Sequence, residues 1–459
     1  MQSHQPSADN PPKSAPGLGS GSVQLRLLLA LAILAGGGGV GAGLANLAVQ
    51  LGAIAVLAAN PGAVARFLRE SPRGFLALVL ASLALPLLQL VPLPPALWQA
   101  LPGREVVRQS FALVGREDAW FPFSLDPART TTAALALLPP LAVLVLAAAL
   151  GKRARRDALA LIVWLALASV LLGAVQVLTE NRWGNLWPGA EGPVLFGFFA
   201  NRNTTAPFLA ICAALALFVD WGERRGLRGA GGAIVAALLI FGAVLTQSRA
   251  GIALCGLVVM LKLASLAMGG KDGRVVSFVL AGAAALVGAL ALAATANQRL
   301  AGILARFSGG EENRLEIWQD TAASIARFWP LGSGQGTFDE VFQLDESLEN
   351  LFALKAGRAH NDYLEIGVEA GALGLLLVAA WLGGTVWRGW KLRAEREAGA
   401  GMARAALVGL AIVAGSSLVD YPLRNETMLC LAALLASILA DPRHASGEPR
   451  AHEQSSRGS

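Results

Sequence analysis

Apolar runs about as long as a membrane span alternate with short charged segments along most of this 459-residue chain. A transmembrane helix needs about 20 mainly apolar residues, and the pattern predicts twelve spans. The first two form a hairpin within 25–59, because that run is too long for one span and the glycines at 36–39 interrupt it. The other ten are predicted at 74–92, 131–150, 158–178, 203–220, 231–247, 250–268, 275–295, 364–387, 403–419 and 427–440.

Basic clusters fall between these runs on one side only, which by the positive-inside rule is the cytoplasm. The resulting organisation places both termini there, as a disordered tail over 1–22 and a second tail over 442–459. Spans one to nine occupy 23–296, with outer loops at 93–130 and 179–200, and spans ten to twelve occupy 363–441. The long polar segment 297–362 becomes a large periplasmic loop containing short helices.

Composition supports an all-α, polytopic membrane protein. Hydrophobic residues make up 55% of the chain and charged residues 15%, against about 25% charged in soluble domains. The net charge of +6 lies in short clusters at span ends, so it does not indicate nucleic-acid binding. The cysteines all fall in apolar runs and the tails hold every histidine except His360, which argues against a disulfide framework, a metal site or a bound cofactor.

His360 is the best candidate for acid–base chemistry. It follows Arg358 and Ala359 at the end of the polar segment, and Asn361 and Asp362 come next, at the edge of a span. Histidine has an unperturbed pKa near 6.5, so it can remove a proton from a hydroxyl at neutral pH.

Three arginines are predicted on the same outer face. Arg202 enters span six, Arg249 occupies a tight turn between spans seven and eight, and Arg314 begins a short amphipathic helix in the long loop. A further turn with glycines at 332, 334 and 336 is a candidate nest of backbone N–H groups for anionic oxygens. Because guanidinium groups bind phosphate oxygens bidentately, these features predict glycosyl transfer from a polyprenyl diphosphate, with arginine rather than metal stabilising the leaving group.

Each of these side chains also has a purely structural interpretation. His360 is equally compatible with a helix-start histidine bonded to Asp362 or to a loop carboxylate, and Arg249 with an arginine reaching for headgroups. Arg202 and Arg314 lie in loops where water is at hand. Asp362 and the nearby glutamates either orient His360 or serve as first-turn acids of span ten.

Five motifs in order resemble the O-antigen ligase and O-antigen polymerase superfamily. They are Asn-Arg-Asn at 201–203, Thr-Gln-Ser-Arg-Ala-Gly at 246–251, Arg-Leu-Glu-Ile-Trp at 314–318, the glycine turn at 330–338 and His-Asn-Asp-Tyr-Leu-Glu at 360–365. The resemblance runs from about 190 to 430. It implies a twelve-span, metal-independent GT-C glycosyltransferase of the bacterial inner membrane that takes a glycan from undecaprenyl diphosphate on the periplasmic face.

The resemblance also implies roles for individual residues. Arg249 and Arg314 match the family's diphosphate-binding arginines, and His360 matches its general base. We expect Arg202, Asn203, Asn361 and Asp362 to bind substrate. The leading hypothesis is a ligase whose acceptor is lipid A–core; a polysaccharide polymerase and a protein O-oligosaccharyltransferase of the same family remain open. A transporter of lipid-linked sugars is disfavoured because the spans carry few charges.

Overall fold

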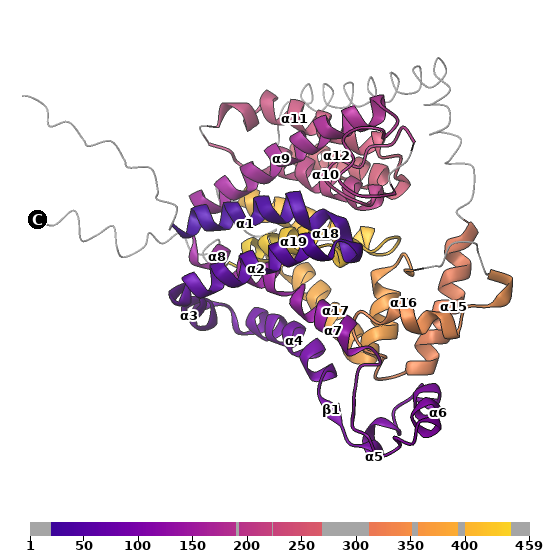
Figure 1. Ribbon diagram of the computed structural model, residues 1–459. Coiled ribbons are helices and arrows are strands. Elements are labelled where there is room, and N and C mark those ends of the chain that lie inside the picture. Colours follow the sequence, from indigo (N-terminus) through magenta and orange to yellow (C-terminus); the bar gives the residue numbers. More distant parts are fainter. Residues whose placement is uncertain are drawn as a thin grey trace, which may run out of the picture.

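The structure is a computed structural model and describes residues 20–189, 192–222, 224–268, 312–350, 357–392 and 400–441. Within these ranges the chain is almost wholly helical (Figure 1). The strands found there are β1 (Pro92–Leu93) and β2 (Phe121–Pro122), a short antiparallel pair. The predicted all-α class is confirmed.

The helices follow the predicted apolar runs closely. Before residue 150 they are α1 (Gly21–Ala35), α2 (Gly43–Ala59), α3 (Pro61–Glu70), α4 (Arg73–Gln89), α5 (Pro95–Trp98), α6 (Glu105–Leu113), α7 (Pro127–Leu135) and α8 (Leu138–Ala149). The central ones are α9 (Lys152–Leu178), α10 (Arg202–Phe218), α11 (Ala230–Leu245) and α12 (Arg249–Met268). The later ones are α15 (Glu312–Phe328), α16 (Phe338–Val341), α17 (Asp362–Leu392), α18 (Ala400–Ser416) and α19 (Glu426–Ala440). Short 3-10 turns are η1 (Gly36–Gly41), η2 (Arg225–Leu227), η3 (Phe342–Leu344), η4 (Leu348–Asn350) and η5 (Pro422–Arg424).

A multi-pass membrane protein is confirmed, whereas the number of spans is not. In the described residues, five helical stretches are long and apolar enough to cross a membrane: Gly21–Gly39, Pro127–Ala149, Lys152–Leu178, Arg249–Ala267 and Asp362–Leu392. The pair α2 and α3, bent by 82°, makes a sixth if it is one span. Helices α4, α10, α11, α18 and α19 coincide with predicted spans but have at most 17 residues, fewer than the usual number of about 20. Twelve spans therefore stay a prediction, and the run 275–295 lies outside the described residues.

Helix α10 lies at the centre of the main hydrophobic core. Every residue from Thr204 to Ala216 is buried, and the helix packs against α9, α11, α12 and α18. A helix that is apolar on all sides must be surrounded in this way. Its first turn carries the predicted site residues Arg202 and Asn203. The packing holds this turn next to the start of α12 and the end of α18.

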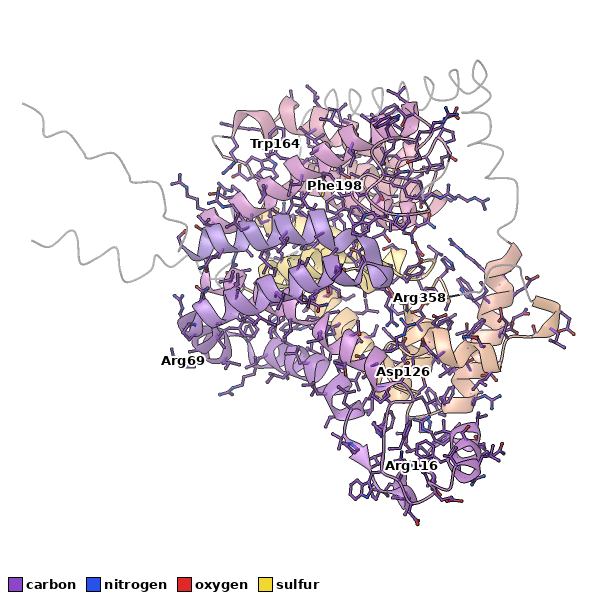
Figure 2. All side chains as sticks on the ribbon, in the orientation of Figure 1. Arg69, Arg116, Asp126, Trp164, Phe198 and Arg358 are labelled. Carbon is purple, nitrogen blue, oxygen red and sulfur yellow. The ribbon has the colours of Figure 1, made fainter. Side chains whose placement is uncertain are left out.

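The polar segments that contain α5, α6, α15 and α16 extend from one end of the helical bundle. Helices α15 and α16 lie beyond that end on the right of Figure 1, with α5 and α6 below them. In Figure 2, Arg358 and Asp126 lie toward this end, and Arg69 lies at the opposite end. The predicted tails 1–22 and 442–459 fall outside the described residues except for the start of α1.

Backbone hydrogen bonds fasten the polar segment to α17. The Ser333 N–H donates to the Val368 carbonyl at 2.9 Å, and the Ala372 N–H donates to the Pro330 carbonyl at 2.8 Å. Helix α17 bends there at Gly371, whose φ of 54° suits glycine; a Cβ would also overlap the Pro330 carbonyl. The turn after α15 is therefore fixed to the helix that follows His360.

The glycine turn is not the anion nest that its sequence predicts. Gly332, Gly334 and Gly336 do have positive φ values, as a nest requires. However, the N–H groups of residues 332 to 335 already donate to the carbonyls of Phe328, Val368 and Glu369 and to the side chain of Gln89. The glycines serve close packing instead: a Cβ on Gly334 would overlap the Ser124 hydroxyl.

Candidate functional site

His360 meets a buried carboxylate that comes from the far end of the sequence. Its Nδ1 lies 3.2 Å from Oδ1 of Asp420, and 32% of its side chain is exposed. Its φ of 50° lies in the left-handed region, which is uncommon for a residue other than glycine and carries strain that often accompanies function. The strained backbone conformation of His360 thus sets its imidazole beside Asp420.

The surroundings of Asp420 fix its orientation. Its second carboxylate oxygen accepts a hydrogen bond from the Asn201 side-chain amide at 3.2 Å, and the Tyr421 ring lies 5.2 Å from the imidazole. Burial, with the nearby Asp420 carboxylate, raises the pKa of Tyr421 to about 12, so this phenol stays neutral at physiological pH. A carboxylate in this position favours the tautomer with the proton on Nδ1, which leaves Nε2 of His360 as a proton acceptor.

Arg249 and Arg314 line one small cleft beside Asp420, together with Asn203 and Ser248. Nη1 of Arg314 donates to the Val419 carbonyl at 2.7 Å. The sequence predicted this convergence only from topology, because these residues share no segment of the chain. The cleft has a volume of about 30 Å³, enough for about two water molecules; a diphosphate would lie across its mouth.

The remaining predicted substrate-binding residues lie around this cleft. Arg202 opens α10, one residue before Asn203, and is not part of the cleft wall. Asn361 caps α17: its side-chain oxygen accepts from the N–H groups of residues 363 and 364, and its amide donates to the Leu418 carbonyl. Asp362 is buried and accepts from the Ser417 hydroxyl at 2.8 Å. The structure therefore gives Asn361 and Asp362 clear structural roles, and their contact with substrate stays a prediction.

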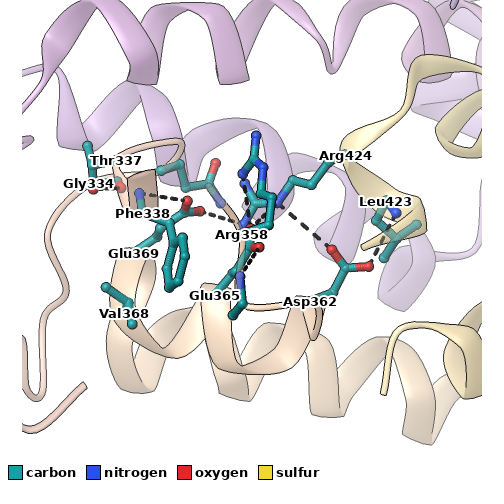
Figure 3. A network of polar contacts seen from close by, with 12 residues as sticks. Gly334, Thr337, Phe338, Arg358, Asp362, Glu365, Val368, Glu369, Leu423 and Arg424 are labelled. Atoms are coloured by element: carbon teal, nitrogen blue, oxygen red, sulfur yellow. Dashed lines mark hydrogen bonds and ion pairs between the residues drawn. The ribbon is translucent and has the colours of Figure 1, made fainter. Parts of the chain in front are cut away.

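A second cluster joins arginines to the carboxylates on one face of α17 (Figure 3). Arg424 lies 2.7 Å from Glu369, 3.1 Å from Glu365 and 3.9 Å from Asp362. Arg358 lies 3.0 Å from Glu365. The three carboxylates stand at positions i, i+3 and i+7, which share one helix face, so a single guanidinium can bind them all.

Two cavities meet at these arginines. One of about 310 Å³ has Arg129, Gln335 and Glu369 in its polar wall and leucines of α4, α17 and α19, with Leu137 between α7 and α8, in its apolar wall. The other, of about 270 Å³, is lined by the glycines of η1, Asn201 and Tyr421. Arg358 and Arg424 line both cavities. In the described part of the chain, no group of three or more His, Cys, Asp or Glu side chains is arranged to hold a metal ion.

Sequence reasoning missed the partners of the predicted residues. Asn201 belongs to the motif at 201–203, but nothing in the sequence pairs Asn201 or Asp420 with His360. The spacing of the acids at 362, 365 and 369 was a usable signal, because it marks one polar face on an otherwise apolar helix. Arg424 lies 55 to 62 positions after these acids along the chain, and this separation hides the contact.

The comparisons with known proteins agree with the motifs. No curated protein matches the chain. A family model described as O-antigen ligase matches residues 234–379, a segment that includes Arg249, Arg314 and His360. Members of that family are membrane glycosyltransferases that use lipid-linked glycans. Residues 234–379 are thus similar to the O-antigen ligase family, in agreement with the resemblance of the motifs.

Proposed function

We propose that the protein transfers a glycan from undecaprenyl diphosphate to a hydroxyl of lipid A–core at the periplasmic face of the bacterial inner membrane, with both termini in the cytoplasm. One observation carries the proposal: Arg249 and Arg314 line the same cleft as the carboxylate that holds His360. A base and two phosphate-binding cations are the groups that this transfer requires.

In the reaction we propose, Nε2 of His360 takes the proton of the acceptor hydroxyl. The oxygen then attacks the anomeric carbon, the bond from that carbon to the phosphate oxygen breaks, and undecaprenyl diphosphate leaves with the electron pair. Asp420 stabilises the imidazolium that forms, since its carboxylate faces Nδ1 at 3.2 Å. The proton passes to solvent afterwards.

The two arginines supply the charge that the leaving group needs. Cleavage of the glycosyl–oxygen bond adds negative charge to a diphosphate that is already anionic. Guanidinium forks bind the more highly charged leaving group more strongly, which is the condition for catalysis by differential binding. We propose that the arginines, rather than a metal ion, stabilise the leaving group. Arg249 begins α12 and Arg314 lies in the first turn of α15, so the two guanidinium groups come from two different helix starts.

The 310 Å³ cavity supports a substrate that is part lipid. Its wall combines arginines with leucines, Val378 and Trp381, which suits an anionic group attached to a hydrocarbon chain. A soluble sugar would leave the apolar part of this wall exposed to water.

The test is transfer by the purified, reconstituted protein supplied with undecaprenyl diphosphate–glycan and lipid A–core. We expect the wild-type protein to form glycosylated lipid A–core, and His360→Ala to insert normally but form none while the lipid-linked donor accumulates. Normal transfer by a stable His360→Ala protein would refute the general-base role. Movement of donor across the bilayer without any new glycosidic product would indicate a transporter instead.

Lipopolysaccharide from cells lacking the protein separates the ligase from its relatives. Loss of a ligase leaves lipid A–core bare while polymer remains on the lipid carrier. Loss of a polymerase instead leaves a single repeat unit attached to core, and loss of a protein O-oligosaccharyltransferase leaves lipopolysaccharide unchanged.

A further inference from the structure

The end of the bundle opposite His360 holds two adjoining cavities. A groove of about 560 Å³ is lined by Phe75 and Leu78 of α4, by Trp381 and Trp387 of α17, and by the end of α19. A second cavity of about 240 Å³ lies against α3, α8 and α19. Pro72, Phe75 and Ala440 line both of them, so the two spaces adjoin. Since α17 starts beside His360 and bends at Gly371, 1.5 Å per residue puts Lys391 roughly 30 Å beyond the bend, about the thickness of a hydrocarbon core.

The groove is apolar, with its charges gathered near one end. Arg388 and Lys391 lie in the last turns of α17; Nζ of Lys391 lies 3.9 Å from the Trp387 ring centre, and Nε of Arg388 donates to the Leu439 carbonyl at 3.0 Å. Trp387 is 56% exposed. Tryptophan beside basic residues at a helix end is typical of the membrane–water boundary, and the apolar length of the groove then lies at the depth of acyl chains.

The smaller cavity is polar and contains a buried hydroxyl without a hydrogen-bond partner. Ser437 is 4% exposed, and its Oγ has no partner in the structure although it lines this space. A buried hydroxyl of this kind destabilises the fold unless a ligand or water satisfies it. Across both cavities the lining contains four basic residues, Arg66, Arg155, Arg388 and Lys391, and two acidic ones, Glu70 and Asp441, a net charge of +2.

We propose that these two cavities bind one anionic glycerophospholipid from the leaflet opposite the glycan-transfer site. The acyl chains occupy the groove between α4 and α17, and the phosphate lies at Arg388 and Lys391. The glycerol or headgroup hydroxyls reach the polar cavity and hydrogen-bond Ser437. Basic pockets between membrane helices recognise anionic headgroups in this way, whereas a zwitterionic lipid brings its own ammonium group into a site that already has excess positive charge.

The site also has a physical reason to be filled. Helix α4 contacts the bundle mainly through α7 and α17, and an edge-to-face contact of 5.7 Å joins Phe75 to Trp381. The Trp381 indole lines this groove and also the 310 Å³ cavity on the other side. An acyl chain in the groove would therefore support the helix pair that forms a wall of the glycan-transfer site.

The experiment measures lipid binding rather than transfer. Full-length protein is delipidated in detergent and titrated with phosphatidylglycerol or with phosphatidylcholine of the same acyl chains, and retained lipid is counted by native mass spectrometry. We expect tighter retention of phosphatidylglycerol. Each basic side chain near a lipid surface changes the affinity for an anionic lipid about fivefold. Lys391→Gln should therefore weaken the binding of phosphatidylglycerol about fivefold and leave the binding of phosphatidylcholine unchanged.

Two further variants separate binding from folding. Gly384→Leu places a side chain in the groove, where the nearest atom to a new Cβ is 4.0 Å away, and it favours the helix; it should abolish retention of both lipids in a folded protein. Lys152→Gln removes a charge at the start of α9, outside both cavities, and should change nothing. Equal retention of the two lipids by wild type, no retention of either, or wild-type retention by Lys391→Gln and Gly384→Leu would each overturn the proposal.

Discussion

Replacing Asp420 by asparagine tests how His360 is held. The carboxylate accepts two hydrogen bonds, one from His360 and one from the Asn201 amide. An asparagine has one oxygen for these two donors. If its amide faces His360, it donates to Nδ1, which moves the ring proton to Nε2 and removes the base. If its amide faces Asn201, two N–H₂ groups oppose each other.

The size of the effect follows from these alternatives. Loss of one hydrogen bond alone is worth about 1 kcal/mol, or about fivefold in rate. Loss of the correct tautomer removes the general-base contribution, which is typically about 10²–10⁴-fold and corresponds to about 3–5 kcal/mol. We expect Asp420→Asn to lower kcat by about a hundredfold or more and to leave the KM for the donor nearly unchanged, because the arginines are untouched.

The assay is transfer in proteoliposomes over a range of pH, with Asn201→Ser as the matched control. Serine keeps an oxygen at the cap of α10, where Asn201 accepts from the Asn203 N–H, but it removes the amide that donates to Asp420. We expect the control to lose less than about tenfold, the effect of one hydrogen bond. An Asp420→Asn protein with wild-type kcat and an unchanged pH profile would show that the carboxylate does not orient a base.

Three further changes test the arginines and the turn. Arg249→Lys should lose most activity, because an ammonium cannot replace a bidentate fork; full activity in the transfer assay would indicate a simple charge or a structural role. Arg424→Gln leaves three buried carboxylates without their shared cation and should destabilise the protein by about 3–5 kcal/mol, seen as a lower thermal unfolding temperature in detergent, and an unchanged temperature would contradict the cluster. Gly334→Ala should destabilise more than Gly115→Ala, because both have positive φ but only the first new Cβ overlaps Ser124; equal melting temperatures would argue against close packing of the turn.

The fold was predictable because its signals are local. Apolar runs and basic clusters place the helices and the outer segments, and the break at 36–39 appears as η1. The prediction was less complete for 93–130, where the chain forms β1, β2 and three helical segments between the interfacial prolines. Its anchor is Arg104, which lies over the rings of Phe123 and Phe328, a contact between distant segments that no local pattern specifies.

The candidate site was predictable only as a set of residue types on one face. The predicted topology places Arg249, Arg314 and His360 on the same side of the membrane, but it does not give the distances between their side chains. The glycine turn shows the opposite error: a sequence that can form an anion nest has its N–H groups bonded to α15, α17 and the Gln89 side chain instead. Whether a backbone donor is available depends on what packs against it, and that information is tertiary.

The cluster at Arg424 also has a consequence for how the chain is made. Helix α17, with its carboxylates at 362, 365 and 369, leaves the ribosome about 55 residues before Arg424 does. At about 5–20 residues per second, that interval is roughly 3–11 s. During that interval the acids at the start of α17 have no partner from η5. Delivery of Arg424 then draws the α17 start into place, and with it comes Asp420, which completes the histidine pair. A chain that ends before this loop would carry His360, Arg249 and Arg314 and still lack Asp420 and Arg424, so the centre cannot assemble until the loop between α18 and α19 has been made.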